Sequence, residues 1–200
     1  MSELPLFPLS ATLVPYGRMP LQIFEQRYLD LVKSSMRSGE GFGIVRILRG
    51  AEVSPEDLPT LAKVGSIATI VDWDQLDNGL LGITVEGGRR FAPQRLWREE
   101  NGLVMAEIEF LSDYDPAAMI DSWEPMRTVL RGLEAHPHVQ RIGLPADFDD
   151  AWQVGLSLVQ LLPLDESLKL ELMTIDSASE LMRELDVILN ALSGEDASLN

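Results

Sequence analysis

Apolar and polar residues alternate over several short segments of the first 112 residues, a pattern that predicts β-strands. Tight turns rich in glycine and asparagine separate these segments at 77–79, 87–88 and 101–102. Strands this closely spaced predict a small barrel or a strongly curled sheet. The predicted strands span 19–23, 41–48, 63–76, 80–86, 89–97 and 103–111.

Prolines mark the first two extended segments, 4–9 and 19–23. Pro5 and Pro8 lie in the first and Pro20 in the second. Because proline has no backbone N–H, we expect the first segment to be an edge strand or an extended lead-in, and the second an edge strand. An exposed edge can accept another strand, so these prolines also predict a place where an extended polypeptide binds.

One helix interrupts the strands and begins near Phe24. Its apolar residues recur at three- and four-residue spacing, which predicts one buried face. Gly39 is placed for a left-handed residue that ends this helix. The predicted face comprises Phe24, Tyr28, Leu31, Val32 and Met36.

From residue 113 the apolar spacing becomes that of helices. A first helix is predicted, which Pro125 kinks or restarts, and 136–145 is predicted to be a loop. The stripe of the first helix comprises Met119, Trp123, Met126, Leu130 and Leu133.

Three more helices are predicted to complete the chain. The first of them, capped by Asp147 or Asp149, has no charged side chain over 151–162, so we expect it to be buried on most sides. Asp165 caps the next helix, and Ser177 with Glu180 forms a capping box for the last. The fold class is therefore α+β, with a β-rich part over 1–112 and an α-helical part over 113–200.

The net charge of −16 is unevenly placed along the 200 residues. Residues 1–100 carry 11 basic and 13 acidic side chains, whereas residues 101–200 carry 5 and 19. Acidic surfaces repel phosphate backbones and anionic lipids, so this charge disfavours nucleic acid and membranes as partners.

Cysteine is absent, which excludes disulfides, thiolate metal sites and a cysteine nucleophile. The N-terminus lacks the pattern of a secretory signal, and no apolar run reaches the ~20 residues of a membrane span. We therefore expect a soluble, cytoplasmic protein.

The sequence shows no catalytic constellation, and we expect no enzyme activity, no cofactor and no metal. Glycines 39, 41 and 43 lie between a helix and a strand, the reverse of the order in nucleotide-binding loops, which favours a capping role. His136 and His138 flank a proline and supply only two of the three or four ligands of a zinc site.

A basic and aromatic cluster at 89–98 is the one feature that favours nucleic acid. It is a small footprint against the overall negative charge. The cluster comprises Arg89, Arg90, Phe91, Arg95, Trp97 and Arg98.

An ordered set of motifs along the chain resembles the N-terminal (LON) domain of Lon-type ATP-dependent proteases. The resemblance runs from about Leu4 to Leu192. The motifs are LPLFPL at 4–9, IFEQRY at 23–28, GFGIV at 41–45, VGSIA at 64–68, GRRF at 88–91 and LLPL at 161–164.

This resemblance implies a PUA-like pseudo-barrel followed by a helical bundle. It also implies a part in recognising unfolded substrates. The sequence contains neither the Walker ATPase segment nor the Ser-Lys proteolytic region of the full proteases, so the resemblance implies no hydrolytic activity.

We therefore expect a non-enzymatic module that binds exposed apolar or extended polypeptide in a crevice between the two parts. Tyr28 and Phe91 also fit a core position, and Glu25 with Arg27 also fits a local ion pair or turn clamp. The candidate residues are Tyr16, Arg27, Tyr28, Trp73, Arg90 and Phe91.

Two other functions stay open. One is an adaptor that docks a folded partner through its acidic helical half, and the less favoured one is RNA binding by the barrel. The sequence predicts no oligomeric state.

Overall fold

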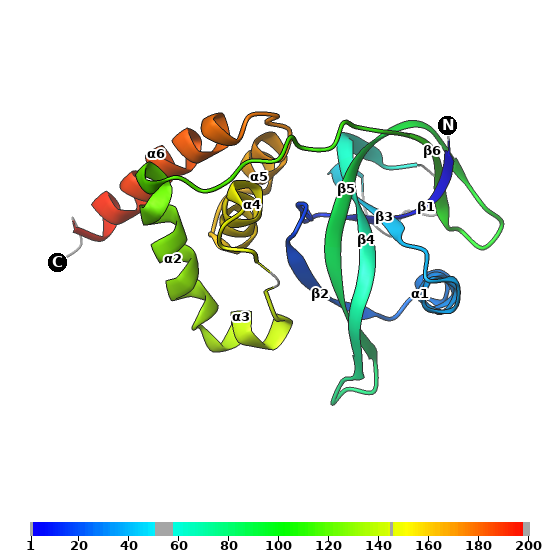
Figure 1. Ribbon diagram of the computed structural model, residues 1–200. Coiled ribbons are helices and arrows are strands. Elements are labelled where there is room, and N and C mark those ends of the chain that lie inside the picture. Colours follow the sequence, from blue (N-terminus) through cyan, green and yellow to red (C-terminus); the bar gives the residue numbers. More distant parts are fainter. Residues whose placement is uncertain (1, 51–57, 145, 198–200) are drawn as a thin grey trace. The chain divides into compact units, whose positions relative to one another are not determined.

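The computed structural model describes residues 2–50, 58–144 and 146–197. These residues form two compact units, Met1–Asp113 and Tyr114–Asn200. Of the described elements, the first unit contains the six strands and one helix, and the second contains the other helices (Figure 1). Each unit is described by itself.

A six-stranded sheet builds the first unit, in the order β2-β5-β4-β3-β1-β6. The long strand β5 pairs with β2 and β4 along its first half and with β6 along its second, so the sheet closes on itself. β4 and β5 continue as a paired hairpin beyond the rest of the sheet (Figure 1). The strands are β1 Ser2–Leu9, β2 Arg18–Ile23, β3 Phe42–Arg49, β4 Thr60–Gln75, β5 Leu81–Arg98 and β6 Val104–Phe110.

The first proline-containing strand is not an edge, which corrects the expectation from sequence. β1 pairs with β6 through Ser2–Leu6 and with β3 through Leu6–Leu9. The two ladders are staggered and share only Leu6, so Pro5 and Pro8 each lie where one neighbour is paired. A missing N–H is tolerated in such a position. β2 is an edge strand, as expected, because it pairs only with β5 among the described strands.

The predicted turn at Gly87-Gly88 is also wrong, because β5 continues through both residues, with a register shift against β4 at this point. Gly87 instead allows a close approach of the chain. A Cβ built there would lie 2.1 Å from the carbonyl oxygen of Val14. The 14–17 loop is bonded to this point, since the N–H of Tyr16 donates to Gly87 O at 2.7 Å and the N–H of Gly87 to Gly17 O at 2.9 Å.

The other two predicted turns are confirmed. Gly79 and Gly102 have left-handed φ values of 80° and 86°. Asn78 Oδ1 accepts the N–H of Leu80, and Asn101 Oδ1 accepts the N–H of Leu103.

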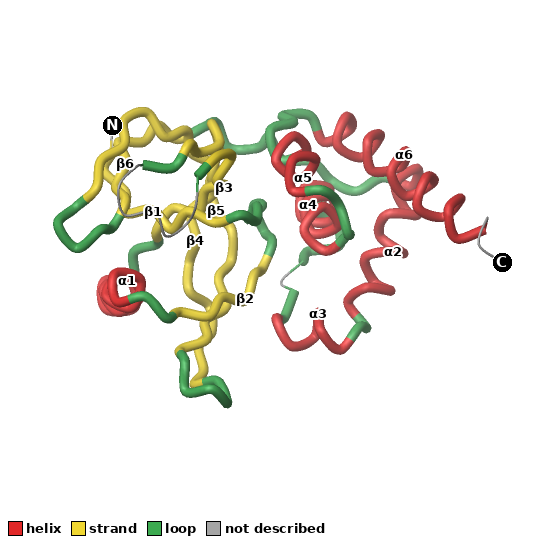
Figure 2. Tube along the Cα trace, turned by 180° about the vertical axis from the view of Figure 1, so that it is seen from behind, coloured by secondary structure: helices red, strands yellow, loops and turns green. Residues whose placement is uncertain are grey.

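Helix α1 spans Gln26–Ser38 and covers one side of the sheet (Figure 2). Gly39 ends it with φ 76°, and the Gly39 N–H donates to Ser35 O, so the predicted C-cap is confirmed. The predicted apolar face was too long at both ends. Phe24 precedes the helix and is 65% exposed, and Met36 is 45% exposed.

One cluster of the core of the first unit lies between α1 and the sheet. Phe7 stacks on Tyr28 with ring centroids 3.9 Å apart and 12° between the planes. Side chains from β1, β3, β5 and α1 meet here, so the helix and the curled sheet stabilise each other. The buried members of this cluster include Ile23, Tyr28, Val32, Phe42, Ile44, Ile83 and Val85.

Five α-helices and one short 3-10 helix, η1 Asp121–Trp123, form the described part of the second unit. Helix α4 is the central one, in contact with α2, α5 and α6. It carries no charge and is buried along most of its length, as the sequence predicted. The helices are α2 Glu124–Glu134, α3 Pro137–Ile142, α4 Ala151–Leu161, α5 Glu166–Leu172 and α6 Ala178–Ala197.

Three expectations for this unit need correction. The predicted loop at 136–145 contains the helix α3, whose Val139 and Ile142 are buried, and Pro145 lies outside the described residues. Asp150, rather than Asp147 or Asp149, caps α4 by accepting the N–H of Gln153 at 3.0 Å. Met119 precedes η1 and is not part of a helix. The restart expected at Pro125 is confirmed, since α2 begins at Glu124 directly after η1, with Pro125 in its first turn.

The N-terminal segment of the second unit is fastened across α4 and α5. Tyr114 stacks on Trp152 at 4.0 Å and donates its hydroxyl hydrogen to Met173 O. The indole N–H of Trp152 donates to Asp115 O at 2.8 Å.

None of the described helices combines the length and the apolar character that a membrane span requires.

Candidate functional site

Three of the six candidate residues belong to the interior of the first unit. Tyr28 and Arg90 are 5% exposed and Phe91 is fully buried. A Cβ at Gly43 or at Gly65 would lie 2.7 Å from Cζ of Phe91, so these two glycines make room for its ring. The core positions expected for Tyr28 and Phe91 are confirmed.

Arg90 and Arg27 hold backbone segments in place. Arg90 donates through Nη2 to Ser112 O at 3.0 Å, next to the end of β6. Arg27 pairs with Glu25 at 2.8 Å, donates to Gly102 O at 2.9 Å and lies over the Tyr28 ring. It is therefore both the ion pair and the turn clamp that the sequence suggested.

Tyr16 is half-buried and is the described non-glycine residue with a left-handed backbone, at φ 62°. Its N–H bonds to β5 at Gly87, and this anchors the loop between β1 and β2. A strained conformation held by such bonds is consistent with a structural part in the loop.

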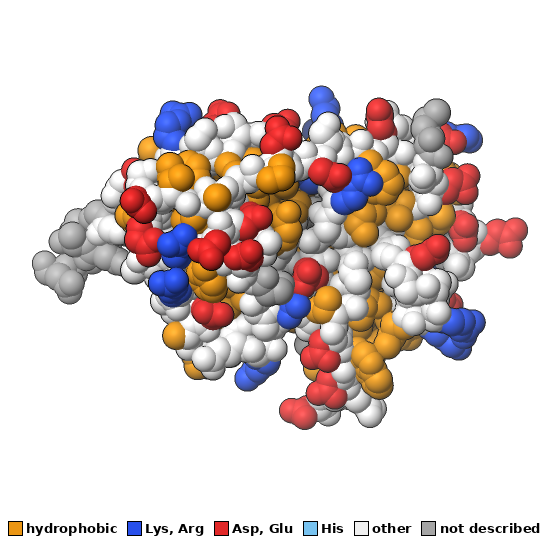
Figure 3. Space-filling model, in the orientation of Figure 1, with side chains coloured by type: hydrophobic (Ala, Val, Ile, Leu, Met, Phe, Trp, Pro, Cys, Tyr) orange, Lys and Arg blue, Asp and Glu red, His pale blue; other side chains and the backbone are white. Residues whose placement is uncertain are grey.

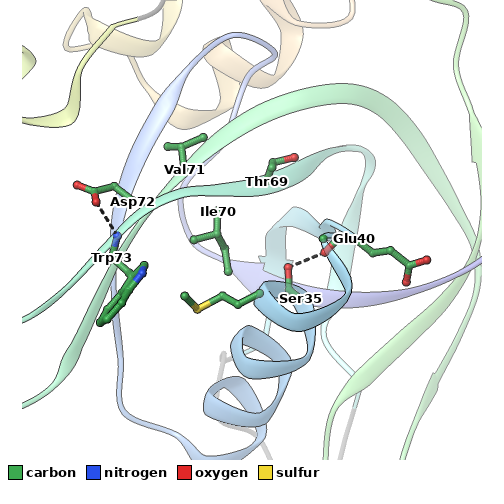
Figure 4. A pocket seen from close by; sticks show the side chains of 9 residues that line it. Ser35, Glu40, Thr69, Ile70, Val71, Asp72 and Trp73 are labelled. Carbon is green, nitrogen blue, oxygen red and sulfur yellow. Dashed lines mark hydrogen bonds between the residues drawn. The ribbon is translucent and has the colours of Figure 1, made fainter.

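Trp73 is the one candidate with a largely exposed side chain, at 59%. It lies on β4, where that strand leaves the sheet with β5, and it lines a hollow of about 370 Å³ between β4 and the end of α1. The structure thus brings none of the other five candidates to the hollow. It is lined by Ser35, Met36, Gly39, Glu40, Thr69, Ile70, Val71, Asp72 and Trp73 (Figure 4).

A β-bulge sets the direction of the Trp73 side chain. Ile70 is opposite Val85 and Asp72 is opposite Thr84, so Val71 is an extra residue without a partner. Trp73 is then opposite Ile83, which is buried and lies on the same face as Val85. Directly opposite residues share a face of the sheet. The extra residue therefore brings Trp73 and Ile70 onto the face that carries α1.

The end of α1 forms the other wall of the hollow. Ser35 Oγ donates to Glu40 O at 2.5 Å, and Gly39 turns the chain into β3. This places Met36 at the rim with its side chain 45% exposed. Met36 and Trp73 give the hollow two exposed apolar side chains, whereas the exposed side chain of Val71 points to the other face of β4 (Figure 4). Figure 3 shows apolar side chains gathered beside the hairpin.

Met36 and Val71 were missed as site residues. In the sequence Met36 fits the buried stripe of α1, and Val71 fits the apolar pattern of a strand. Their exposure follows from where α1 ends and where β4 bulges, and neither is visible in local spacing. The useful signal was the run Ile70, Val71 and Trp73 near a hairpin end, which contains more apolar residues than one buried face requires.

The residues suspected of other chemistry have partners of their own. His136 Nδ1 accepts the N–H of His138, and the described residues contain no group of three or more His, Asp or Glu that could hold a metal ion. In the basic and aromatic cluster, Arg89 pairs with Asp113 and Arg98 donates to Gly102 O. Arg90 is buried, so Arg89 and Arg95 are the exposed cations of this cluster.

Comparison with known proteins gives a consistent result. Residues 3–191 match the family model of the ATP-dependent protease La (LON) substrate-binding domain. Among curated proteins, the chain is 25% identical over 197 residues to Lon protease 2 of Herpetosiphon aurantiacus, covering 94% of this chain and 24% of that protein. It is 29% identical over 111 residues to Lon protease of Anaeromyxobacter dehalogenans, covering 55% of this chain and 13% of that protein.

Solved structures show the same likeness. A Lon N-terminal domain protein from Xanthomonas campestris is 32% identical, with a TM-score of 0.72, and the match covers 94% of this chain and 98% of that one. The N-terminal domain of the Mycobacterium avium complex Lon protease is 16% identical with a TM-score of 0.58 and shares the fold, over 92% of this chain and 96% of that one. The chain spans about a quarter or less of the curated proteases that it matches.

Proposed function

Because the chain belongs to the LON substrate-binding domain family, we propose that it recognises exposed apolar segments of extended polypeptide through the hollow at Trp73. It does so by contact, with no bond-breaking chemistry. The proposed site lies on the surface of the first unit, whereas the sequence predicted a crevice between the two parts.

The exposure of Trp73 is the observation that carries this proposal. Its side chain is 59% exposed and lies beside the exposed side chain of Met36. Apolar surface in contact with water is unfavourable, and a bound partner would cover it. Buried tryptophans dominate the binding energy of many interfaces. Trp73 is fixed on a paired strand, so little conformational freedom is lost when it is covered.

The form of the hollow favours an extended chain over a compact small molecule. Its volume of about 370 Å³ lies near the lower limit of the roughly 300–1,000 Å³ of small-molecule pockets. It is open along the side of β4 and α1 (Figure 4). An extended polypeptide can place one or two apolar side chains there while the rest of the chain stays in water.

Fluorescence anisotropy of a labelled peptide tests the proposal. The probe is a glycine–serine peptide with two central phenylalanines, and the same peptide without phenylalanine is the reference. We expect binding that needs the phenylalanines. Trp73→Ala should weaken it about tenfold or more, the effect of losing an aromatic residue at the centre of an interface.

Val187→Ala provides the matched control, because Val187 is 60% exposed on α6 of the second unit. This variant should bind the peptide as the parent protein does. Equal affinity of the parent and Trp73→Ala would refute the proposal. The proposal would also be refuted if the peptide does not bind and the protein instead self-associates with rising concentration in a way that Trp73→Ala abolishes. A second copy of the chain would then occupy the hollow.

Strand addition at β1 is not part of this proposal, because β6 pairs with Ser2–Leu6 on one side and β3 with Leu6–Leu9 on the other, which leaves only short unpaired stretches. β2 still has a free side, but Pro20 at its centre removes one donor. Side-chain contacts at the hollow are therefore the better-supported mode of binding.

The adaptor hypothesis keeps one supporting observation. The second unit has 16 acidic and 5 basic residues over 114–200, and its cations are largely used within the unit. Arg127 contacts Glu124 and Asp149, and Lys169 contacts Glu166. A purified folded partner whose binding is lost with added salt and unaffected by Trp73→Ala would favour this second function.

We also infer the finer fold assignment, a PUA-like pseudo-barrel followed by a helical bundle. Closure of the sheet through the β5–β6 pairing supports the first part. The contacts of α4 with α2, α5 and α6 support the second.

A further inference from the structure

The charged groups of the hollow are both carboxylates. Glu40 and Asp72 are the only ionisable residues among those that line it, and both are exposed. Figure 4 shows them on opposite sides of Ile70, so the apolar floor lies between two negative charges. No described residue forms an ion pair with either one.

The position of each carboxylate is tied to the backbone around the hollow. Asp72 Oδ1 accepts the backbone N–H of Trp73 at 2.9 Å, which holds that carboxylate close to β4 on the face opposite to the indole. The Glu40 carbonyl accepts the Ser35 hydroxyl, which fixes the residue at the end of α1. A carboxylate accepts several hydrogen bonds, so each can also receive a cationic donor from a ligand.

Resting on the proposed function, we propose that the hollow selects segments in which a large apolar side chain is flanked on both sides by Lys or Arg. The apolar side chain covers Trp73 and Met36. Successive side chains of an extended segment point to opposite faces, so the flanking cations lie near Asp72, on the other face of β4, and near Glu40 beyond the end of α1. Segments with acidic flanks are rejected, because like charges would face each other across the rim.

A set of three labelled peptides tests this selection. All have the same two central phenylalanines, with flanks of lysine, serine or glutamate. We expect the lysine-flanked peptide to bind most tightly and the glutamate-flanked peptide least. Exposed ion pairs contribute modestly, so the expected gain is about two- to fivefold per cation over serine. The gain should shrink as salt is added, since screening weakens exposed pairs.

Charge-neutral variants separate the rim from the general acidity of the protein. Glu40→Gln with Asp72→Asn removes both charges, and the asparagine oxygen can still accept the Trp73 N–H. Glu134→Gln with Asp186→Asn removes the same charge from exposed positions of the second unit. Only the first pair should reduce the preference for lysine flanks, and circular dichroism confirms that both double variants are folded.

The outcomes are distinguishable. If all three peptides bind equally, this inference fails and the proposed function stands. If both double variants lose the preference to the same degree, net charge is the cause and the inference also fails. If no peptide binds, the inference and the proposed function fail together.

Discussion

At the scale of single residues, some glycines are required by a close backbone contact and others are not, and the sequence alone does not distinguish the two kinds. Gly87 lies where β5 passes under the 14–17 loop, and a Cβ there would be 2.1 Å from Val14 O. Gly132 lies on the exposed side of α2, and a Cβ there would meet nothing within 4 Å.

Alanine at these two positions should therefore have opposite effects. Gly87→Ala should lower the free energy of unfolding by about 3 kcal/mol, because the clash is with backbone that must move. Gly132→Ala should raise it by about 0.5–1 kcal/mol, the helix preference of alanine over glycine. Urea unfolding followed by circular dichroism measures both, and a neutral Gly87→Ala would contradict the close approach.

The candidate residues show a similar limit of prediction. Arginine and aromatic residues were chosen because they are common in binding sites, but their burial depends on contacts distant in the sequence. Phe91 fills the space left by Gly43 and Gly65, and Arg27 holds the turn at Gly102. Trp73 was chosen for the same reason, and it is exposed because it lies on the part of β4 that leaves the sheet with β5.

At the scale of elements, most helices and strands follow from the sequence pattern, and the errors have physical causes. The uncharged run of α4 predicted its burial correctly, since no other position suits such a helix. β1 was misplaced because proline was taken as an edge signal, whereas the staggered ladders accommodate it. The cap of α4 was assigned to the wrong aspartate because Asp147, Asp149 and Asp150 all precede the helix, and local propensity does not distinguish among them.

The cap provides a direct test of this element. Asp150→Ala should lower the stability of the second unit by about 1 kcal/mol, because it leaves the Gln153 N–H without its acceptor. Asp150→Asn should cost much less, since asparagine is also a good cap. Thermal unfolding of the two variants measures the difference, and equal losses would show that charge rather than the cap bond is responsible.

At the scale of the whole molecule, charge is the dominant property. A net charge of −16 on 200 residues means that acidic side chains repel one another across the surface. We expect sodium chloride at about 0.1 M to raise the unfolding temperature relative to low salt, because the Debye length then falls to about 10 Å. Calorimetry at neutral pH measures this, and a fall in the unfolding temperature would show that attractive pairs outweigh repulsion.

The bulge at Val71 has a consequence for how this surface can change. Val71 is the residue in excess, so its loss would leave Ile70 opposite Val85 and Trp73 opposite Ile83 and would remove the local twist that the bulge adds to the strand. A change of length at this point, with the other residues kept, therefore changes the direction in which the hairpin and its indole leave the sheet. Relatives that differ by a single insertion at this point should differ in what they bind, even where their site residues align.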